Sequence, residues 1–368
     1  MAARPATRRS TERALGSAQR PIVRDLGRGS STFTIEWDVR PAFDFLFSLS
    51  VEAGSTDDLP ADDRRWLTEA KESLPEDART GLAELFGSEL CINAGVLLID
   101  RPDIKTSAQF VDFIDTIEPR DVIRPILQDH HRDPEVDAIV EQAISGDASA
   151  IDAVEQRLPE WKREGRIAIL REPEAARDRI VSVLRAWQAR YAEVEPRIAE
   201  ILELDYEGRA NDRATMAATD LIESTTGGIR WLPESGIRRV ILGPSYFSRP
   251  YNFLMSGGDW RFFGYPVADS ALDAADSLAA PQSVVRLHRA LGDATRLKIL
   301  KLLASRDLYL TEIAQLLDLS KPTIKHHLAQ LRAAGLVTIT ESGTVMYYSL
   351  RRNRLDDASS EIKRFLVG

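Results

Sequence analysis

Residues 319–332 read LSKPTIKHHLAQLR, followed by AAGLV at 333–337, and this stretch decides the fold of the C-terminal region. Ser320 is a residue type that caps helix N-termini, and Pro322 falls in the first turn, where a missing N–H is tolerated. The apolar positions recur at helical spacing: Ile324, Leu328 and Leu331. A helix that buries this stripe and exposes short polar and cationic side chains on its other side suits the major groove of DNA.

The preceding and following sequence supplies the other parts of a winged helix-turn-helix in the required order. Apolar spacing and capping residues predict three earlier helices, at 284–291, at 294–305 after a cap at Asp293, and after a cap at Thr311. Residues 318–320 then form the tight turn into the recognition helix. Two runs of β-branched and aromatic residues, 336–340 and 345–350, flank a turn at 341–344 and predict a hairpin, the wing.

These pieces together resemble the ArsR/SmtB family of transcriptional repressors. The resemblance rests on LGDATRLKIL at 291–300, on residues 321–336 and on YYSL at 347–350, and it covers about the last quarter of the chain. It implies a homodimer that binds double-stranded operator DNA and releases it when an effector binds.

Several side chains of the predicted helix and wing are candidates for DNA contact. The candidates are Ser320, Lys321, Thr323, Lys325, His326, His327, Gln330, Arg351 and Arg352. Those on the polar face of the helix are expected to read base edges or phosphates. We expect Ser320, Arg351 and Arg352 to anchor the DNA backbone. His327 lies closer to the apolar stripe and is interpreted as a partly buried helper.

The usual metal sites of the family are not matched. Where its metal sensors carry a Cys-x-Cys pair, this chain has Tyr309 and Thr311, and residues 355–368 contain carboxylates but no histidine. A zinc or thiophilic ion needs several Cys or His ligands, so no metal and no cofactor is predicted. The cluster at 129–133, DHHRD, has adjacent side chains that point apart and also predicts no metal site.

Length and charge distribution predict a basic DNA-binding domain joined to an acidic N-terminal domain. The 368 residues are enough for two domains with separate cores. We expect a disordered basic arm at 1–30, an N-terminal α+β domain at 31–275 that senses an effector or dimerises, and the winged helix at 276–368. Residues 282–368 carry a net charge of +6 and the arm +5, whereas the remainder carries −20. This division concentrates the attraction for phosphate in the DNA-binding domain, although solubility explains an acidic N-terminal domain equally well.

The predicted fold class is mainly α with small β elements. A short strand is expected at 34–37, and helices at 41–51, 61–73, 76–86, 107–116, 134–144, 148–157 and 173–203, the last broken at Pro196. Residues 228–267 are rich in β-formers, and Gly257–Asp259 is a hairpin signal, so a small antiparallel sheet of two to four strands is expected. Aromatics beside Arg249, Arg261 and Asn252 either line a small-molecule pocket or form the core of this sheet.

No signature of catalysis appears in the sequence. Nucleotide-binding loops, the serine-hydrolase elbow and the zinc-protease motif are absent, so no catalytic residue is predicted. No apolar run is long enough to span a membrane, the N-terminus has no secretory pattern and Cys91 is the single cysteine, so a cytoplasmic protein is expected. We predict a DNA-binding repressor that is not an enzyme; the alternatives are an enzyme or a protein-interaction scaffold with an appended winged helix.

Overall fold

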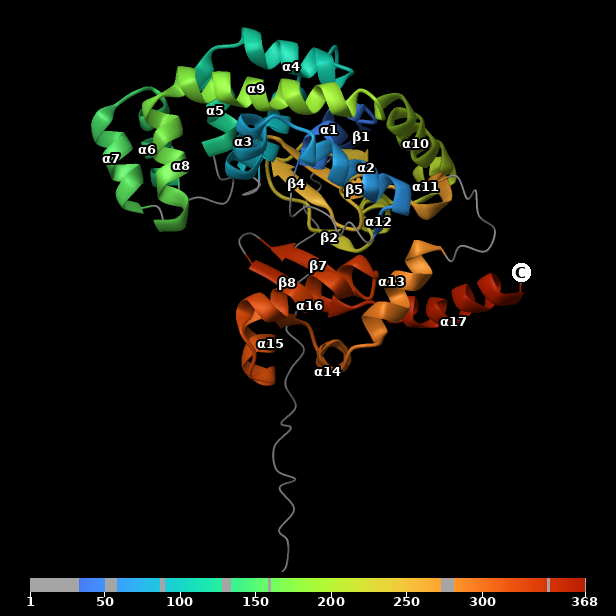
Figure 1. Ribbon diagram of the computed structural model, residues 1–368. Helices are drawn as coiled ribbons and strands as arrows, with labels where there is room; N and C mark the ends of the chain where they lie inside the picture. The colour runs from blue at the N-terminus through green and yellow to red at the C-terminus, as the bar shows by residue number, and fades with distance from the viewer. Residues whose placement is uncertain are drawn as a thin grey trace, which may run out of the picture. The chain divides into compact units, whose positions relative to one another are not determined.

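The structure is a computed structural model that describes residues 33–49, 58–86, 90–127, 134–157, 160–272, 281–342 and 345–367. The predicted arm, the cluster at 129–133 and the side chain of Cys91 lie outside what it describes. Helices predominate and two four-stranded sheets accompany them, which confirms the predicted fold class (Figure 1). None of the described helices is both long and apolar enough to cross a membrane.

Residues 33–272, here called the body, are mostly helical. Their α-helices are α1 (Pro41–Leu49), α2 (Ala61–Glu72), α3 (Glu76–Phe86), α4 (Ser107–Thr116), α5 (Pro119–Leu127), α6 (Pro134–Ile144), α7 (Ala148–Arg157), α8 (Glu160–Arg171), α9 (Pro173–Tyr191), α10 (Glu195–Gly208), α11 (Ala210–Thr215) and α12 (Ala218–Thr225). Two 3-10 helices, η2 (Leu90–Leu98) and η3 (Asp269–Ala271), complete them. The long helix expected at 173–203 is interrupted before Pro196, which occupies the first turn of α10.

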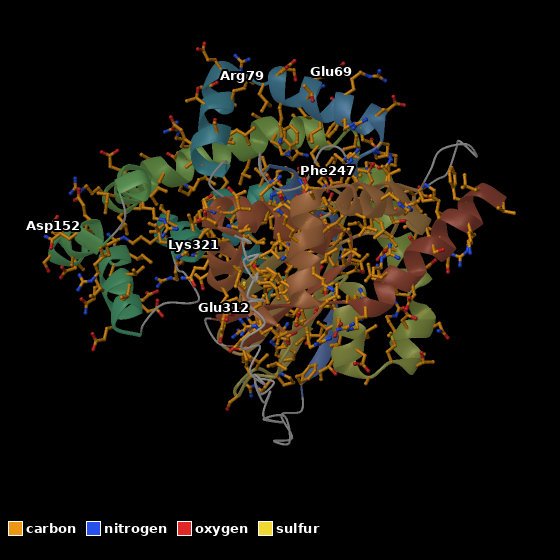
Figure 2. The ribbon with its side chains drawn as sticks, turned by 90° about the horizontal axis from the view of Figure 1, so that it is seen from below. Glu69, Arg79, Asp152, Phe247, Glu312 and Lys321 are labelled. Carbon is orange, nitrogen blue, oxygen red and sulfur yellow. The ribbon has the colours of Figure 1, made fainter. Side chains whose placement is uncertain are left out.

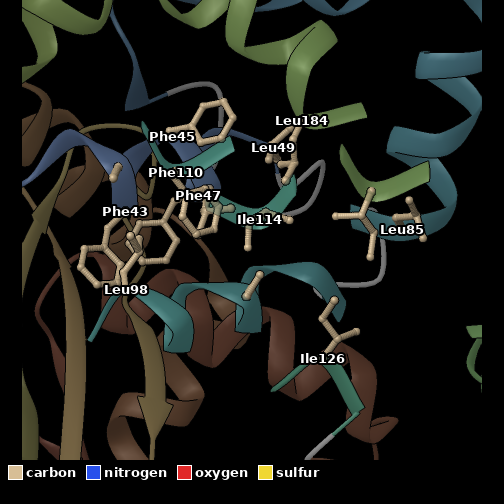
Figure 3. Close-up of a cluster of buried hydrophobic side chains, with 14 of the residues drawn as sticks. Phe43, Phe45, Phe47, Leu49, Leu85, Leu98, Phe110, Ile114, Ile126 and Leu184 are labelled. Atoms are coloured by element: carbon tan, nitrogen blue, oxygen red, sulfur yellow. The ribbon is translucent and has the colours of Figure 1, made fainter. Parts of the chain in front are cut away.

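Helix α9 is the central support of the body. It runs alongside α4 and also contacts α3, α5 and α8 (Figure 1). Its apolar stripe is buried, and Trp187 in that stripe donates its indole N–H to Ser48 Oγ at 2.8 Å. Figure 3 shows the aromatic side chains of α1, among them Phe43 and Phe47, in the same core as Leu184 of α9. The stripe of α9 is therefore core, as its spacing predicted.

The body sheet is mixed, which corrects the expectation of antiparallel pairing. Its strands are β1 (Thr34–Trp37), β3 (Arg239–Ser245), β4 (Phe253–Ser256) and β5 (Trp260–Pro266), in the order β1-β3-β5-β4. Only β4 and β5 pair in antiparallel fashion, whereas β1, β3 and β5 are parallel. The hairpin predicted at Gly257–Asp259 joins β4 to β5, and β5 lies between β4 and β3 and runs parallel to β3.

Strand β3 is covered on both faces. Ile241 packs in the helical core of the body, while Val240 and Leu242 belong to a second cluster with Phe263 and Tyr265 of β5. An unbroken apolar run of this kind is typical of a parallel strand buried between two layers.

Residues 281–367, here called the winged-helix region, have a core of their own around Leu287, Ile299, Ile313 and Leu331. The elements are α13 (Gln282–Leu291), α14 (Ala294–Leu303), β6 (Leu308–Tyr309), α15 (Leu310–Leu317), α16 (Lys321–Ala333), β7 (Val337–Ser342), β8 (Val345–Leu350) and α17 (Arg352–Val367). Their order confirms the predicted winged helix-turn-helix.

One predicted helix start is wrong. Helix α15 begins at Leu310, so Thr311 lies inside it rather than capping it. The carboxylate of Glu312 instead accepts the Tyr309 N–H at 2.9 Å and satisfies the backbone ahead of the helix. The short strand β6 explains the shift, because Tyr309 is paired with Tyr347 of β8 and the helix follows at once.

A strand of the body completes the sheet of the wing. Strand β2 (Ile229–Trp231) pairs in parallel with β7, giving the order β2-β7-β8-β6, rather than joining the body sheet as expected. Gly228, at a φ of 126°, precedes it, and its carbonyl accepts the Ile339 N–H at 3.0 Å. The side chains of Ile229 and Trp231 pack in the same cluster as β3 and β5. Main-chain bonds of β2 thus hold the wing while its side chains belong to the body.

Candidate nucleic-acid interface

The start of α16 is fixed by its own capping residues. Ser320 Oγ accepts the Thr323 N–H at 3.3 Å and lies 2.7 Å from Thr323 Oγ1. Pro322 occupies the first turn. Ahead of this cap, Asp318 has a φ of 54°, the left-handed conformation that ends α15. The resulting turn sets the angle at which α16 leaves α15.

Helix α16 separates into a buried stripe and an exposed face. Ile324, Leu328 and Leu331 are each 1% exposed or less and pack in the winged-helix core. The exposed polar side chains of the helix are Lys321, Thr323, Lys325 and His326. Figure 2 shows Lys321 at the beginning of this helix. The two faces give α16 the shape and charge that entry into a major groove requires.

A buried arginine orients part of the exposed face. Arg296 of α14, 8% exposed, donates from Nε to the Ala290 carbonyl at 2.8 Å and from Nη2 to the Arg289 carbonyl at 2.7 Å. Its third bond goes from Nη1 to Oε1 of Gln330. Gln330 Nε2 lies 2.8 Å from His326 Nε2. Because arginine has only donors, the amide of Gln330 must turn its NH2 to His326, and the Nδ1 position then holds the proton of the neutral ring.

The other candidate on this helix, His327, is largely inside. Its side chain is 15% exposed, and Nδ1 lies 3.9 Å from Asp293 Oδ1, the cap of α14. Burial lowers the pKa of His327 below its usual range. The ring is therefore neutral at pH 7, and it packs between α14 and α16.

The two candidate arginines at the base of the wing have different surroundings. Arg352 is exposed, and its Nη2 donates to the Ala304 carbonyl, the end of α14, at 2.5 Å. Arg351 is half-buried, its main-chain N–H donates to the Leu336 carbonyl at 3.0 Å, and its side chain borders a cavity next to the body. The structure thus brings Ser320 to Gln330 together on α16 and leaves Arg351 and Arg352 at a separate place.

Tyr309, at one of the two positions compared with the Cys-x-Cys pair, has an aromatic partner on strand β8. The Tyr309 ring lies 4.2 Å from the ring of Tyr347, and the two hydroxyls are hydrogen-bonded. Among the residues that the structure describes, no group of three or more His, Cys, Asp or Glu side chains is placed to hold a metal ion.

A cavity of about 700 Å³ borders the exposed face of α16. Lys325, His326 and Arg332 form one wall, and Tyr251–Leu254 of the body form another. This volume fits a small molecule and not a duplex. Entry of α16 into DNA therefore requires residues 251–254 to move away from it.

Arg296 and Arg332 were not singled out by sequence reasoning. Arg296 lies within the LGDATRLKIL stretch that carries the family resemblance, which was a usable signal. Arg332 lines a cavity together with Tyr251, which is far away in the sequence, and no local pattern marks it.

Comparisons with known proteins agree with this geometry. The family model described as bacterial regulatory protein, arsR family, matches residues 293–338, which run from the cap of α14 into β7. The transcriptional repressor SdpR of Bacillus subtilis is 37% identical over 80 residues, which are 22% of this chain and 89% of SdpR. The regulator KmtR of Mycobacterium tuberculosis is 38% identical over 72 residues, 20% of this chain and 55% of KmtR. CmtR of Mycobacterium bovis is 36% identical over 85 residues, 23% of this chain and 72% of CmtR.

These matches cover nearly the whole of SdpR but under a quarter of this chain, so they bear on the winged-helix region alone. The helix order, the exposed cationic face of α16 and the matched residues lead to one assignment: the chain belongs to the ArsR family of bacterial regulatory proteins, which are DNA-binding regulators of transcription.

Proposed function

We propose that this protein is a repressor that binds operator DNA as a homodimer through α16, with the body sensing a ligand or partner. The carrying observation is the exposed face of α16, where Lys321, Thr323, Lys325 and His326 stand opposite a fully buried stripe. In this proposal these four side chains read base edges or phosphates. Gln330 and His327 hold the face in place, because both are half-buried and contact α14 or its cap.

The DNA backbone is gripped at the edges of this face. Ser320 lies at the helix N-terminus, where free main-chain N–H groups attract phosphate. Arg352 is exposed at the wing base and has further donors beyond the one that binds the Ala304 carbonyl. Arg351 is half-buried beside it, so its contribution to phosphate binding is smaller in this proposal.

A second copy of the chain is expected to pair through α17. The last turn of this helix exposes Phe365, Leu366 and Val367, of which Val367 is 85% exposed. Burying such an apolar end against its counterpart is favourable, and paired recognition helices about one DNA turn apart follow from a two-fold axis. The proposed division places the sensing domain at residues 31–275 and the DNA-binding domain at 276–368.

The test begins with genomic fragments selected by the full-length protein, followed by titration of labelled duplex in fluorescence anisotropy. The double variant Lys325→Ala with His326→Ala should weaken binding by about 1–3 kcal/mol per lost base contact and lower the salt slope by about 0.9. Lys105→Ala in the body is the matched control, since it removes the same net charge from an exposed site outside the winged-helix region. Equal affinity of the double variant and the control would exclude α16 as the reading element.

The rival classes give different outcomes in the same experiment. A protein-interaction scaffold would show no DNA selection, and sedimentation equilibrium at about twice 41.1 kDa would still report a dimer. An enzyme with an appended reader would bind DNA and in addition turn over a substrate in the full chain.

A further inference from the structure

The guanidinium of Arg332, at the C-terminal end of α16, has no carboxylate partner among the described residues. Its side chain lines one cavity together with Tyr251 of the body and Tyr348 of the wing, and burial lowers its pKa. Across the described part of the chain, no carboxylate pairs with this guanidinium and no hydrogen bond to it is found. Arg332 is half-buried, and a partly dehydrated guanidinium without a carboxylate partner is suited to an anion supplied from outside.

A cavity of about 410 Å³ lies next to this side chain, between the body and the winged-helix region. Five arginines and one aspartate line it: Arg209, Arg286, Arg332, Arg351, Arg354 and Asp269. Three of these arginines are already engaged, Arg209 with Asp205, Arg286 with Asp58 and Arg354 with Glu361. The charge in excess is that of Arg332 and Arg351, for which the described residues provide no carboxylate.

Two residues of the body that line the same cavity each hold a buried polar atom without a hydrogen bond among the described residues. Thr225 Oγ1, in a residue 4% exposed, and Asn252 Oδ1 have no hydrogen bond among the described residues. The Asn252 amide is fixed, because its Nδ2 donates to the Thr226 carbonyl at 2.9 Å. Buried polar atoms in proteins are nearly always hydrogen-bonded, so these two point to a polar ligand. Because Asn252 Oδ1 is an acceptor, that ligand needs a donor as well as a negative charge.

We propose that this cavity binds a small organic anion whose carboxylate or phosphate pairs with Arg332 and Arg351, and whose hydroxyl or amino group donates to Asn252 Oδ1. The volume is in the range of small-molecule sites. Both arginines present planar forks that match either oxyanion.

The proposed site predicts that the ligand lowers the affinity of the protein for DNA, and this expectation rests on the proposed DNA-binding function. Arg332 borders both this cavity and the one in front of Lys325 and His326. An anion that joins Arg332 to Thr225 and Asn252 fastens α16 to the body, in the arrangement that excludes a duplex. Ligand and operator therefore stabilise different states, and each lowers the affinity of the other by the same factor.

The experiment uses the full-length protein and three probes at constant ionic strength: inorganic phosphate, 3-phosphoglycerate, which carries phosphate, carboxylate and hydroxyl groups, and glycerol as the neutral control. We expect saturable thermal stabilisation by 3-phosphoglycerate with a Kd of about 1 mM or tighter, weaker stabilisation by phosphate and none by glycerol. Arg332→Gln should abolish the stabilisation, whereas Arg65→Gln, which removes an exposed charge on α2 of the body, should keep it.

The Tm of the ligand-free variants separates a binding role from a structural one. Removing a half-buried charge that has no partner among the described residues should leave the Tm of Arg332→Gln equal to or above that of the wild type. A lowered Tm together with retained stabilisation by anions would overturn the proposal, as would the absence of saturable binding by both anions.

Operator binding by the wild type without added anion is measured separately by anisotropy. If the protein binds DNA but anions do not stabilise it, the proposed anion site is refuted and the proposed DNA-binding function is retained. If anions stabilise the protein but it does not bind DNA, the proposed DNA-binding function is refuted and the anion site is retained.

Discussion

Replacement of Arg296 by methionine tests how the reading face is held. The substitution keeps the length of the buried stem and removes all three hydrogen bonds of the guanidinium, to two carbonyls at the end of α13 and to Gln330. Each acceptor left unsatisfied in the interior costs about 1–3 kcal/mol. Part of this loss is recovered because a buried charge no longer has to be desolvated. We expect a net destabilisation of the winged-helix region of about 3 kcal/mol.

Hydrogen exchange of the full chain measures this locally. A loss of about 3 kcal/mol corresponds to roughly 100-fold faster exchange in peptides of α13 and α16. All 6 tryptophans lie at or before Trp260, so their fluorescence in urea reports the body and serves as an internal control. Lys298→Met, on the exposed side of the same helix, should leave exchange near the wild-type rate.

The result that refutes the reasoning is unchanged protection in α13 and α16 of Arg296→Met. That outcome would mean that side-chain packing stabilises α13 and α16 without the hydrogen bonds of Arg296. An equal loss of protection in the body would instead show that the effect is not local to Arg296.

Two other substitutions give independent checks. Burial raises the pKa of Asp44 from 3.8 to about 6, so the folded state holds a proton that the unfolded state loses, and the free energy of unfolding falls as pH rises between those values. In Asp44→Asn this decrease, about 3 kcal/mol in urea titrations at pH 4 and pH 7, should disappear. A difference from wild type that is the same at both pH values would contradict this expectation. Ser320→Ala removes the cap of α16 and should cost about 1 kcal/mol, seen as roughly fivefold faster exchange confined to the first turn; unchanged exchange there would show that Pro322 alone fixes the start.

The sequence was most informative where structure is local. The caps at Asp293 and Ser320 and the apolar spacing of α16 are set by neighbours within a few residues, and the structure has them as expected. Helix α5 was missed because Pro125 inside it is a breaker in any local pattern, yet Val122, Ile123 and Ile126 bury the helix in the core.

Features that join distant segments could not be predicted in this way. The parallel β1–β3 pairing joins residues about 200 positions apart, and the pairing of β2 with β7 joins residues about 110 positions apart. Even so, the unbroken apolar run Val240–Leu242 is typical of a strand covered on both faces, and it argued against a half-exposed antiparallel sheet.

The candidate site divides in the same manner. The exposed face of α16 followed from periodicity alone. That Gln330 is held by Arg296, and that Arg332 stands beside Tyr251, depends on tertiary packing that no spacing rule contains.

The borrowed strand β2 also bears on how this protein can be dissected. A fragment starting at residue 281 would retain the recognition helix and lose Ile229–Trp231, leaving the main-chain donors and acceptors of β7 exposed along one edge. Such an open edge is a template for strand pairing between chains, and self-association of the fragment would imitate genuine dimerisation. A separate peptide of residues 218–231, added to such a fragment, should pair with β7 and close that edge.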